Sequence, residues 1–265
     1  MFVTRLISGV VLLVLLAFFL FTGNIWLFGM CLALSLMGMF ELYRIYGYHK
    51  GILGYAGYIA AILYYVAVYM NINVLETGIL VMSLIVILGV YVITFPKYKS
   101  EEVAICYFAF VYVAVMLSYI YRIRIMENGI YCVWLVFICS WGNDTCAYCV
   151  GRLFGKHKMS PKLSPKKSVE GAVGGIAGAA LIAAIYGYAF SSRLTTLSNP
   201  AAACAIACAA GAFISIFGDL AASAIKRNHD IKDYGRLIPG HGGIMDRFDS
   251  VIFTAPIVYY VLTLL

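Results

Sequence analysis

Long apolar runs, separated by short polar connections, recur along the whole chain. Each is about 20 residues long, which is the length an α-helix needs to cross a hydrocarbon core of about 30 Å. We expect spans at about residues 5–22, 25–41, 52–70, 74–95, 103–121, 128–150, 170–190, 200–222 and 250–265. The runs do not alternate between apolar and polar positions as transmembrane β-strands do. The pattern therefore predicts an all-α, polytopic integral membrane protein with about nine transmembrane helices.

Composition agrees with this prediction and bears on the partners. The 265 residues are 63% hydrophobic and 12% charged, whereas soluble domains are about 45–50% apolar and about 25% charged. The net charge is +7, but the basic residues cluster beside the apolar runs, as membrane topology and anionic headgroups favour. We expect the lipid bilayer to be a partner and expect no nucleic acid.

The basic residues also predict an orientation. The connection between the sixth and seventh runs carries six of them: Arg152, Lys156, Lys158, Lys162, Lys166 and Lys167. Because cytoplasmic connections are enriched in Lys and Arg, we place this loop on the cytoplasmic side of a cell membrane. The connection between the eighth and ninth runs lies on the same side.

Ionisable residues are concentrated in the second half of the chain. Of 19 basic and 12 acidic residues, 12 and seven fall between positions 144 and 249. Ionisable groups inside a membrane protein usually mark a functional site. We therefore expect an N-terminal scaffold over 1–125 and a catalytic region over 126–265, with cytoplasmic loops 151–169 and 223–249.

The predicted scaffold offers little chemistry. Glu41 and Arg44 are three positions apart, so on a helix their side chains can pair with each other. We expect the remaining side chains of this half to form the packed interior and the lipid-facing surface.

The sixth apolar run ends in a polar face. Asp144, Tyr148 and Arg152 are spaced four apart, so they share one side of a helix if the helix continues. The following loop, 156–167, contains two Ser-Pro steps that favour extended or turn conformations. Its positive charge can attract phosphate or lipid headgroups, or it can serve only to fix topology. Glycines of the seventh run indicate close helix contact or, alternatively, backbone approach to a ligand.

The eighth run ends in a second polar face. Asp219, Ser223, Lys226 and Arg227 lie on one helical stripe, with the two cations at the helix C-terminus where the helix dipole favours them. Asp219 is the deepest of the four in apolar sequence. An unpaired carboxylate there would cost several kcal/mol, so we expect Asp219 to meet a basic side chain or a metal ion.

The polar stretch after this helix predicts a phosphate site. Residues 239–243 (Pro-Gly-His-Gly-Gly) cannot continue a helix and leave backbone N–H groups to face a ligand. Asp246 and Asp249 share one face if a helix begins there. Aspartates beside several cations suggest Mg²⁺ with phosphate, since Mg²⁺ prefers one or two carboxylates together with phosphate oxygens and water. His241 is either part of this site or a structural turn residue.

The eight cysteines do not predict a metal or redox site. Cys146 and Cys149 form a Cys-x-x-Cys pair, but no second pair or histidine cluster lies nearby to complete a tetrahedral site. Because buried cysteine behaves as a small apolar residue, we interpret all eight as helix-packing positions.

The motifs together resemble those of the phosphatidate cytidylyltransferase (CDP-diacylglycerol synthase) family. The resemblance covers about residues 140–250 and rests on three motifs: Asp144 to Lys156, Ser164 to Gly171, and Ser223 to Asp249 with its Pro-Gly-His-Gly-Gly run. It implies transfer of the cytidylyl group of CTP to phosphatidic acid, with a divalent cation, at the cytoplasmic face. With the small residues of the seventh run, it also makes a homodimer an expected state.

Spacing and resemblance together assign roles to individual residues. We expect Mg²⁺ to be bound by Asp219 and Asp246, with Asp249 as a further ligand and Asp144 as an alternative one. The predicted catalytic residues are Asp219, Asp246, Lys226, Arg227 and Ser223. The predicted substrate-binding residues are Lys232, Asp233, His241, Gly242, Gly243, Arg247, Asp144, Arg152 and Lys167.

Two other classes of function compete with this interpretation. A different lipid phosphotransferase or kinase is one; the Asp-Gly-x-x-Ala-Arg run expected of phosphatidyl-alcohol transferases is absent, and nucleotide preference would distinguish a kinase. A secondary transporter is the other. Transporters tend to show repeated halves and ionisable groups near the membrane midplane, whereas this chain has no repeat and gathers its charges at one side.

Overall fold

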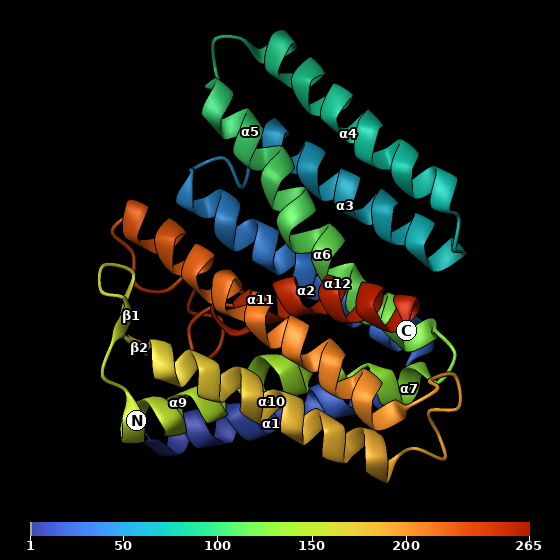
Figure 1. Ribbon diagram of the computed structural model, residues 1–265. Coiled ribbons are helices and arrows are strands. Elements are labelled where there is room, and N and C mark those ends of the chain that lie inside the picture. The colour runs from blue at the N-terminus through green and yellow to red at the C-terminus, as the bar shows by residue number, and fades with distance from the viewer. Residues whose placement is uncertain (1) are drawn as a thin grey trace. The chain divides into compact units, whose positions relative to one another are not determined.

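The computed structural model describes residues 2–265, with side chains from residue 7 onward. The first half consists of α1 (Phe2–Thr22), α2 (Asn24–Ile45), α3 (Ile52–Met70), α4 (Asn73–Thr94), α5 (Ser100–Ala109), the π-helical segment η1 (Phe110–Val115) and α6 (Met116–Ile125). The second half consists of α7 (Gly129–Cys132), α8 (Trp134–Phe137), the π-helical segment η2 (Ile138–Gly142), α9 (Asn143–Phe154), β1 (Lys158–Ser160), β2 (Ser164–Ser168), α10 (Val169–Ala189), α11 (Pro200–Asn228) and α12 (Met245–Leu264) (Figure 1).

The described helices confirm an all-α, polytopic membrane fold. Seven helical segments are long and apolar enough to cross a membrane: α2, α3, α4, the continuous segment 100–125, α10, α11 and α12. The first run forms the helix α1, whose side chains are described only from Ile7 onward. The predicted sixth span is four consecutive short segments, α7, α8, η2 and α9, and the wider turns of η2 interrupt the regular helix over Ile138–Gly142. Whether the first and sixth runs span the membrane therefore stays a prediction.

The chain forms two compact units. The first contains Met1–Tyr121 and Asp233–Asp246, and the second contains Arg122–Lys232 and Arg247–Leu265. The segment Asp233–Asp246, called the 233–246 segment below, thus folds with the N-terminal helices although it follows them by more than a hundred residues. The sequence-based division into scaffold and catalytic region concerns function and stays a prediction.

In the first unit, buried hydroxyl groups join the helices within an apolar interior. Ser35 on α2 and Tyr65 on α3 are both fully buried, and their side-chain oxygens are 2.8 Å apart. The hydroxyl of Tyr43 donates to the carbonyl of Cys106 over 2.9 Å. These bonds satisfy polar groups that would otherwise be costly to bury, so α2, α3 and α5 are held in a fixed arrangement.

In the second unit, α10 lies beside α11 (Figure 1) and packs closely on α9. The reason is the row of glycines on α10. A Cβ atom added to Gly171 would lie 2.8 Å from the carbonyl oxygen of Ala147, and one added to Gly178 would lie 2.6 Å from Sγ of Cys146. The prediction of close helix contact is confirmed. Because this contact lies within one chain, the glycines no longer favour a homodimer.

Replacing Gly171 by alanine should destabilise the second unit. The added Cβ would also lie 3.1 Å from Cα of Gly151, so backbone would have to move. Such overpacking costs about 1–3 kcal/mol, and we expect a lower thermal unfolding midpoint in detergent. Gly78→Ala on α4 is the matched control, because a Cβ there meets no heavy atom within 4 Å. Equal midpoints for the two variants would contradict this account of the α9–α10 contact.

The basic loop forms an antiparallel hairpin of β1 and β2, which confirms the extended conformation expected from its Ser-Pro steps. Two side chains join this hairpin to α10. The carboxylate of Glu170 accepts hydrogen bonds from the backbone N–H groups of Lys156 and His157, at 3.1 and 3.2 Å. The hydroxyl of Ser168 accepts from the N–H of Gly171 and so caps the helix. The hairpin is therefore tied to the start of α10, and its strand β2 carries Lys166 and Lys167.

Candidate active site

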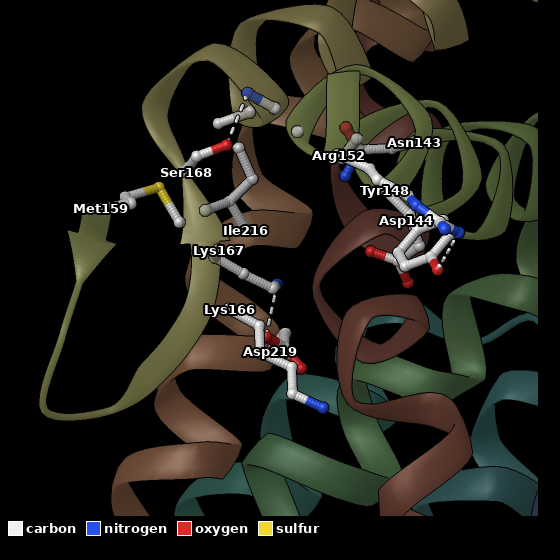
Figure 2. A pocket seen from close by; sticks show the side chains of 14 residues that line it. Asn143, Asp144, Tyr148, Arg152, Met159, Lys166, Lys167, Ser168, Ile216 and Asp219 are labelled. Atoms are coloured by element: carbon white, nitrogen blue, oxygen red, sulfur yellow. Dashed lines mark hydrogen bonds and ion pairs between the residues drawn. The ribbon is translucent and has the colours of Figure 1, made fainter. Parts of the chain in front are cut away.

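A cavity of about 390 Å³ lies in the second unit, between α9, β2, α10 and α11. Its size falls within the range of roughly 300–1,000 Å³ that is common for small-molecule sites. The charged residues at its wall are Asp144, Arg152, Lys166, Lys167 and Asp219 (Figure 2). The structure thus brings together four residues that the sequence predicts for the site (Asp144, Arg152, Lys167 and Asp219).

The polar face predicted for the sixth run is confirmed. The helix α9 continues through Asp144, Tyr148 and Arg152, and all three line the cavity. A guanidinium nitrogen of Arg152 donates to the hydroxyl of Tyr148 over 3.4 Å. One helix face therefore presents an acid, a phenol and a cation to the same space.

Asp219 is paired with Lys167. Lys167 lies on β2 and Asp219 on α11, and the two side chains form an ion pair at the cavity wall (Figure 2). They are 30% and 27% exposed, so the pair is partly open to solvent. The expectation that Asp219 meets a cation is confirmed, and the cation in this structure is a lysine. Asp144 and Asp249 are both near enough to interact electrostatically with Asp219.

A second cavity, of about 250 Å³, lies between the hairpin and the last turns of α11. Its ionisable lining residues are all basic: Lys166, Lys226, Arg227 and Lys232. Ser223 adds a hydroxyl, and Lys166 lines both cavities. The helical stripe predicted for α11 is therefore confirmed, with Asp219 at the first cavity and the rest at the second. A cluster of cations with a hydroxyl favours an anionic ligand such as phosphate.

The 233–246 segment folds around the carboxylate of Asp246. Its Oδ2 accepts hydrogen bonds from the backbone N–H groups of Tyr234 and Gly243, over 2.7 and 3.0 Å. Gly240 and Gly242 have φ angles of 77° and 89°, which favour glycine. A Cβ on Gly242 would also lie 2.8 Å from the same Oδ2. These glycines therefore allow the turn that places backbone donors on Asp246, and α12 begins beside it, at Met245.

His241 contacts the first helix. Its Nδ1 is 2.8 Å from the hydroxyl of Ser8, which also donates to the carbonyl of Pro239 over 3.0 Å. A hydroxyl has a single proton. If that proton goes to Pro239, the ring N–H of His241 is the donor in the other bond. His241 therefore has a structural contact, while its predicted substrate role and that of the exposed Asp233 stay predictions.

The second unit contains side chains of the type that binds a divalent cation. Asp144, Asp219 and Asp249 supply carboxylate oxygens, the ligands that Mg²⁺ prefers. In the described part of the chain, no three His, Cys, Asp or Glu side chains converge closely enough to hold a metal ion by themselves. A site completed by substrate phosphate needs only one or two carboxylates. Asp219 and Asp246 belong to different units, so the prediction that they share an ion stays a prediction.

The sequence did not predict the partners of three polar residues, Glu41, Arg44 and Asn143. The spacing of Glu41 and Arg44 predicts a mutual pair, but the structure directs both to the backbone of the 233–246 segment. Asn143 is 2% exposed, lines the larger cavity and donates to the hydroxyl of Ser215 over 3.0 Å. The only signal in the sequence was a polar residue within an apolar run, because the partners of Glu41, Arg44 and Asn143 lie far away along the chain.

Comparisons with known proteins agree with the resemblance found in the sequence. A family model with the description "Cytidylyltransferase family" matches residues 3–265. The phosphatidate cytidylyltransferase of Bacillus subtilis (strain 168) is 29% identical over 190 residues, or 69% of this chain and 66% of the relative. That of Staphylococcus haemolyticus (strain JCSC1435) is 31% identical over 192 residues, or 70% and 68%. The matched part of the chain thus corresponds to about two thirds of each of these relatives.

Proposed function

Because the chain belongs to the cytidylyltransferase family, we propose that it transfers the cytidylyl group of CTP to phosphatidic acid, forming CDP-diacylglycerol and pyrophosphate. The names of its relatives support this substrate pair. The observation that carries the proposal is the pair of cavities in the second unit. One has carboxylates and cations at its wall, the other is basic, and Lys166 lines both.

The reaction needs little acid–base chemistry. A phosphate oxygen of phosphatidic acid forms a bond to the α-phosphorus of CTP, while the bond from that phosphorus to the bridging oxygen of the β-phosphate breaks and pyrophosphate leaves. The attacking phosphate is already ionised near neutral pH. The obstacle is repulsion between two highly charged anions, so catalysis requires positioning and electrostatic stabilisation.

The basic residues of the two cavities meet that requirement. Lys226, Arg227 and Lys232 would bind phosphate groups in the smaller cavity, with Ser223 orienting a phosphate oxygen. Lys167 would hold phosphate charge beside Asp219. Fixed cations in a partly enclosed site stabilise developing charge without reorganising at the moment of reaction.

The acidic residues would hold a divalent cation. We propose Mg²⁺ bound by Asp219, with Asp246 and Asp249 as further ligands; when bound, the ion neutralises phosphate charge. We also propose that the site faces the cytoplasm of a cell membrane, because the hairpin lysines beside it follow the positive-inside rule. A homodimer stays part of the proposal, on the family resemblance alone.

The purified protein, incubated with CTP labelled at the α-phosphate, phosphatidic acid in detergent micelles and Mg²⁺, should form a labelled lipid that migrates with CDP-diacylglycerol. Omitting either phosphatidic acid or Mg²⁺ should abolish the product. A parallel reaction with ATP labelled at the γ-phosphate and diacylglycerol tests the kinase alternative. Labelled lipid in that reaction alone would overturn the proposal.

A further inference from the structure

The carboxylate of Glu41 binds the backbone at the start of α12. Glu41 lies on α2 and is 4% exposed. Its Oε1 accepts from the N–H of Ile244 over 3.0 Å, and its Oε2 accepts from the N–H of Met245 over 2.9 Å. The first N–H groups of a helix have no partner within the helix. Glu41 supplies two of them with acceptors, from a position about two hundred residues earlier in the chain.

The 233–246 segment is shaped to receive this carboxylate. A Cβ on Gly235 would lie 2.9 Å from Cδ of Glu41, and one on Gly243 would lie 2.5 Å from the same atom. Glycine at both positions is therefore needed for the segment to enclose the Glu41 side chain. A carboxylate suits this environment because it only accepts hydrogen bonds, and the backbone N–H groups of Ile244 and Met245 are both donors.

Arg44, one helical turn further along α2, holds the other end of the segment. A guanidinium nitrogen of Arg44 donates to the carbonyl of Tyr234 over 2.6 Å. The N–H of the same Tyr234 donates to Oδ2 of Asp246. Tyr234 is thus held on one side by Arg44 and on the other by Asp246, so contacts with α2 and the orientation of the Asp246 carboxylate are mechanically connected.

We propose that Glu41, supported by Arg44, is a positioning residue that orders the 233–246 segment and thereby aims the Asp246 carboxylate. The first half of the chain then orders the segment that carries a proposed cation ligand, instead of serving only as a scaffold. The catalytic consequence rests on the proposed function. The ordering of the segment does not, and the experiment separates the two.

Glu41→Gln tests the ordering without any substrate. Glutamine keeps the size of the side chain but presents an NH₂ group to one of the two N–H donors, so one hydrogen bond must be lost. We expect backbone amide hydrogen exchange in peptides covering 233–246 to accelerate at least tenfold, because exchange reports local opening. Ser35→Ala is the matched control: it removes a buried hydrogen bond of the same helix, but to Tyr65. It should leave exchange in 233–246 unchanged.

The cation dependence of the reaction tests the consequence for Asp246. Loss of groups that orient a metal ligand lowers metal affinity by about 10–100-fold. Glu41→Gln should therefore raise the Mg²⁺ concentration for half-maximal rate by about tenfold or more. Ser35→Ala, which only destabilises the fold, should lower the amount of active protein without shifting that concentration.

Three results would overturn the inference: unchanged exchange in 233–246 for Glu41→Gln, the same acceleration in Ser35→Ala, or accelerated exchange without a shift in the Mg²⁺ requirement.

If Glu41→Gln does not fold, Arg44→Met replaces it, because Arg44 lies at an exposed position. Arg44→Met should accelerate amide exchange around Tyr234, and normal exchange there would overturn the inference. If the wild-type protein forms no cytidine-containing lipid, the proposed function fails, while the exchange result still decides whether Glu41 orders the segment.

Discussion

Asp219→Asn should lower the rate of CDP-diacylglycerol formation by about three orders of magnitude while leaving the protein folded. Asp219 is the carboxylate at the wall of the larger cavity, is paired with Lys167, and interacts electrostatically with Asp144 and Asp249. Removing one preorganised electrostatic group from an active site typically costs 10²–10³-fold in rate, and a proposed cation ligand should lie at the upper end. The measurement is initial rate with labelled CTP at saturating substrates.

Folding of this variant should be little affected, because the Lys167–Asp219 pair is partly exposed and such pairs contribute at most about 1 kcal/mol. The thermal unfolding midpoint in detergent checks this. Asp230→Asn is the matched control: Asp230 follows the end of α11, is exposed, and has a φ of 52° that asparagine tolerates. It should retain wild-type rate. Substantial activity in folded Asp219→Asn, above about a tenth of wild type, would remove Asp219 from the proposed mechanism.

Lys167→Met should lower kcat/KM by about two orders of magnitude. Methionine keeps most of the length of the side chain and removes the charge, so the Asp219 carboxylate loses its partner and the cavity loses a cation for phosphate. Lys162→Met at the exposed turn of the hairpin is the control, since Lys162 lines neither cavity. It should have little effect on kcat/KM.

The double variant Lys167→Met with Asp219→Asn tests whether the two residues act as one unit. Residues that act as a unit show strongly non-additive effects. We expect the double variant to be about as slow as Asp219→Asn alone. Additive losses would show that the two residues act independently, and their pairing in the structure would then have no catalytic meaning. Equal losses in Lys162→Met would indicate that only the overall charge of the hairpin matters.

Local patterns in the sequence predicted much of the site. The four-residue spacing of Asp144, Tyr148 and Arg152 placed them on one face of α9, and the structure puts all three at the cavity wall. The stripe of Asp219, Ser223 and Lys226 was equally predictable, because α11 continues without interruption through these positions. Helix periodicity is a local property, so it can be deduced from spacing alone.

Which partner each polar group meets could not be obtained in that way. Asp219 required a cation, but only the packing of the hairpin within the second unit identified Lys167 rather than one of the neighbouring lysines. The spacing of Glu41 and Arg44 suggested a mutual pair, whereas the structure places the 233–246 segment against both. A contact between distant positions leaves no periodic signal in a single sequence.

Composition and the spacing of nearby residues were thus enough to predict the long apolar helices, the helix faces that carry charge, and the family, because each depends on composition or on residues close together in the chain. Tertiary structure decided that two cavities share Lys166, that Lys167 neutralises Asp219, and that α2 holds the 233–246 segment. The physical reason is that buried polar groups must find partners, and the identity of those partners depends on how elements far apart in the chain pack together.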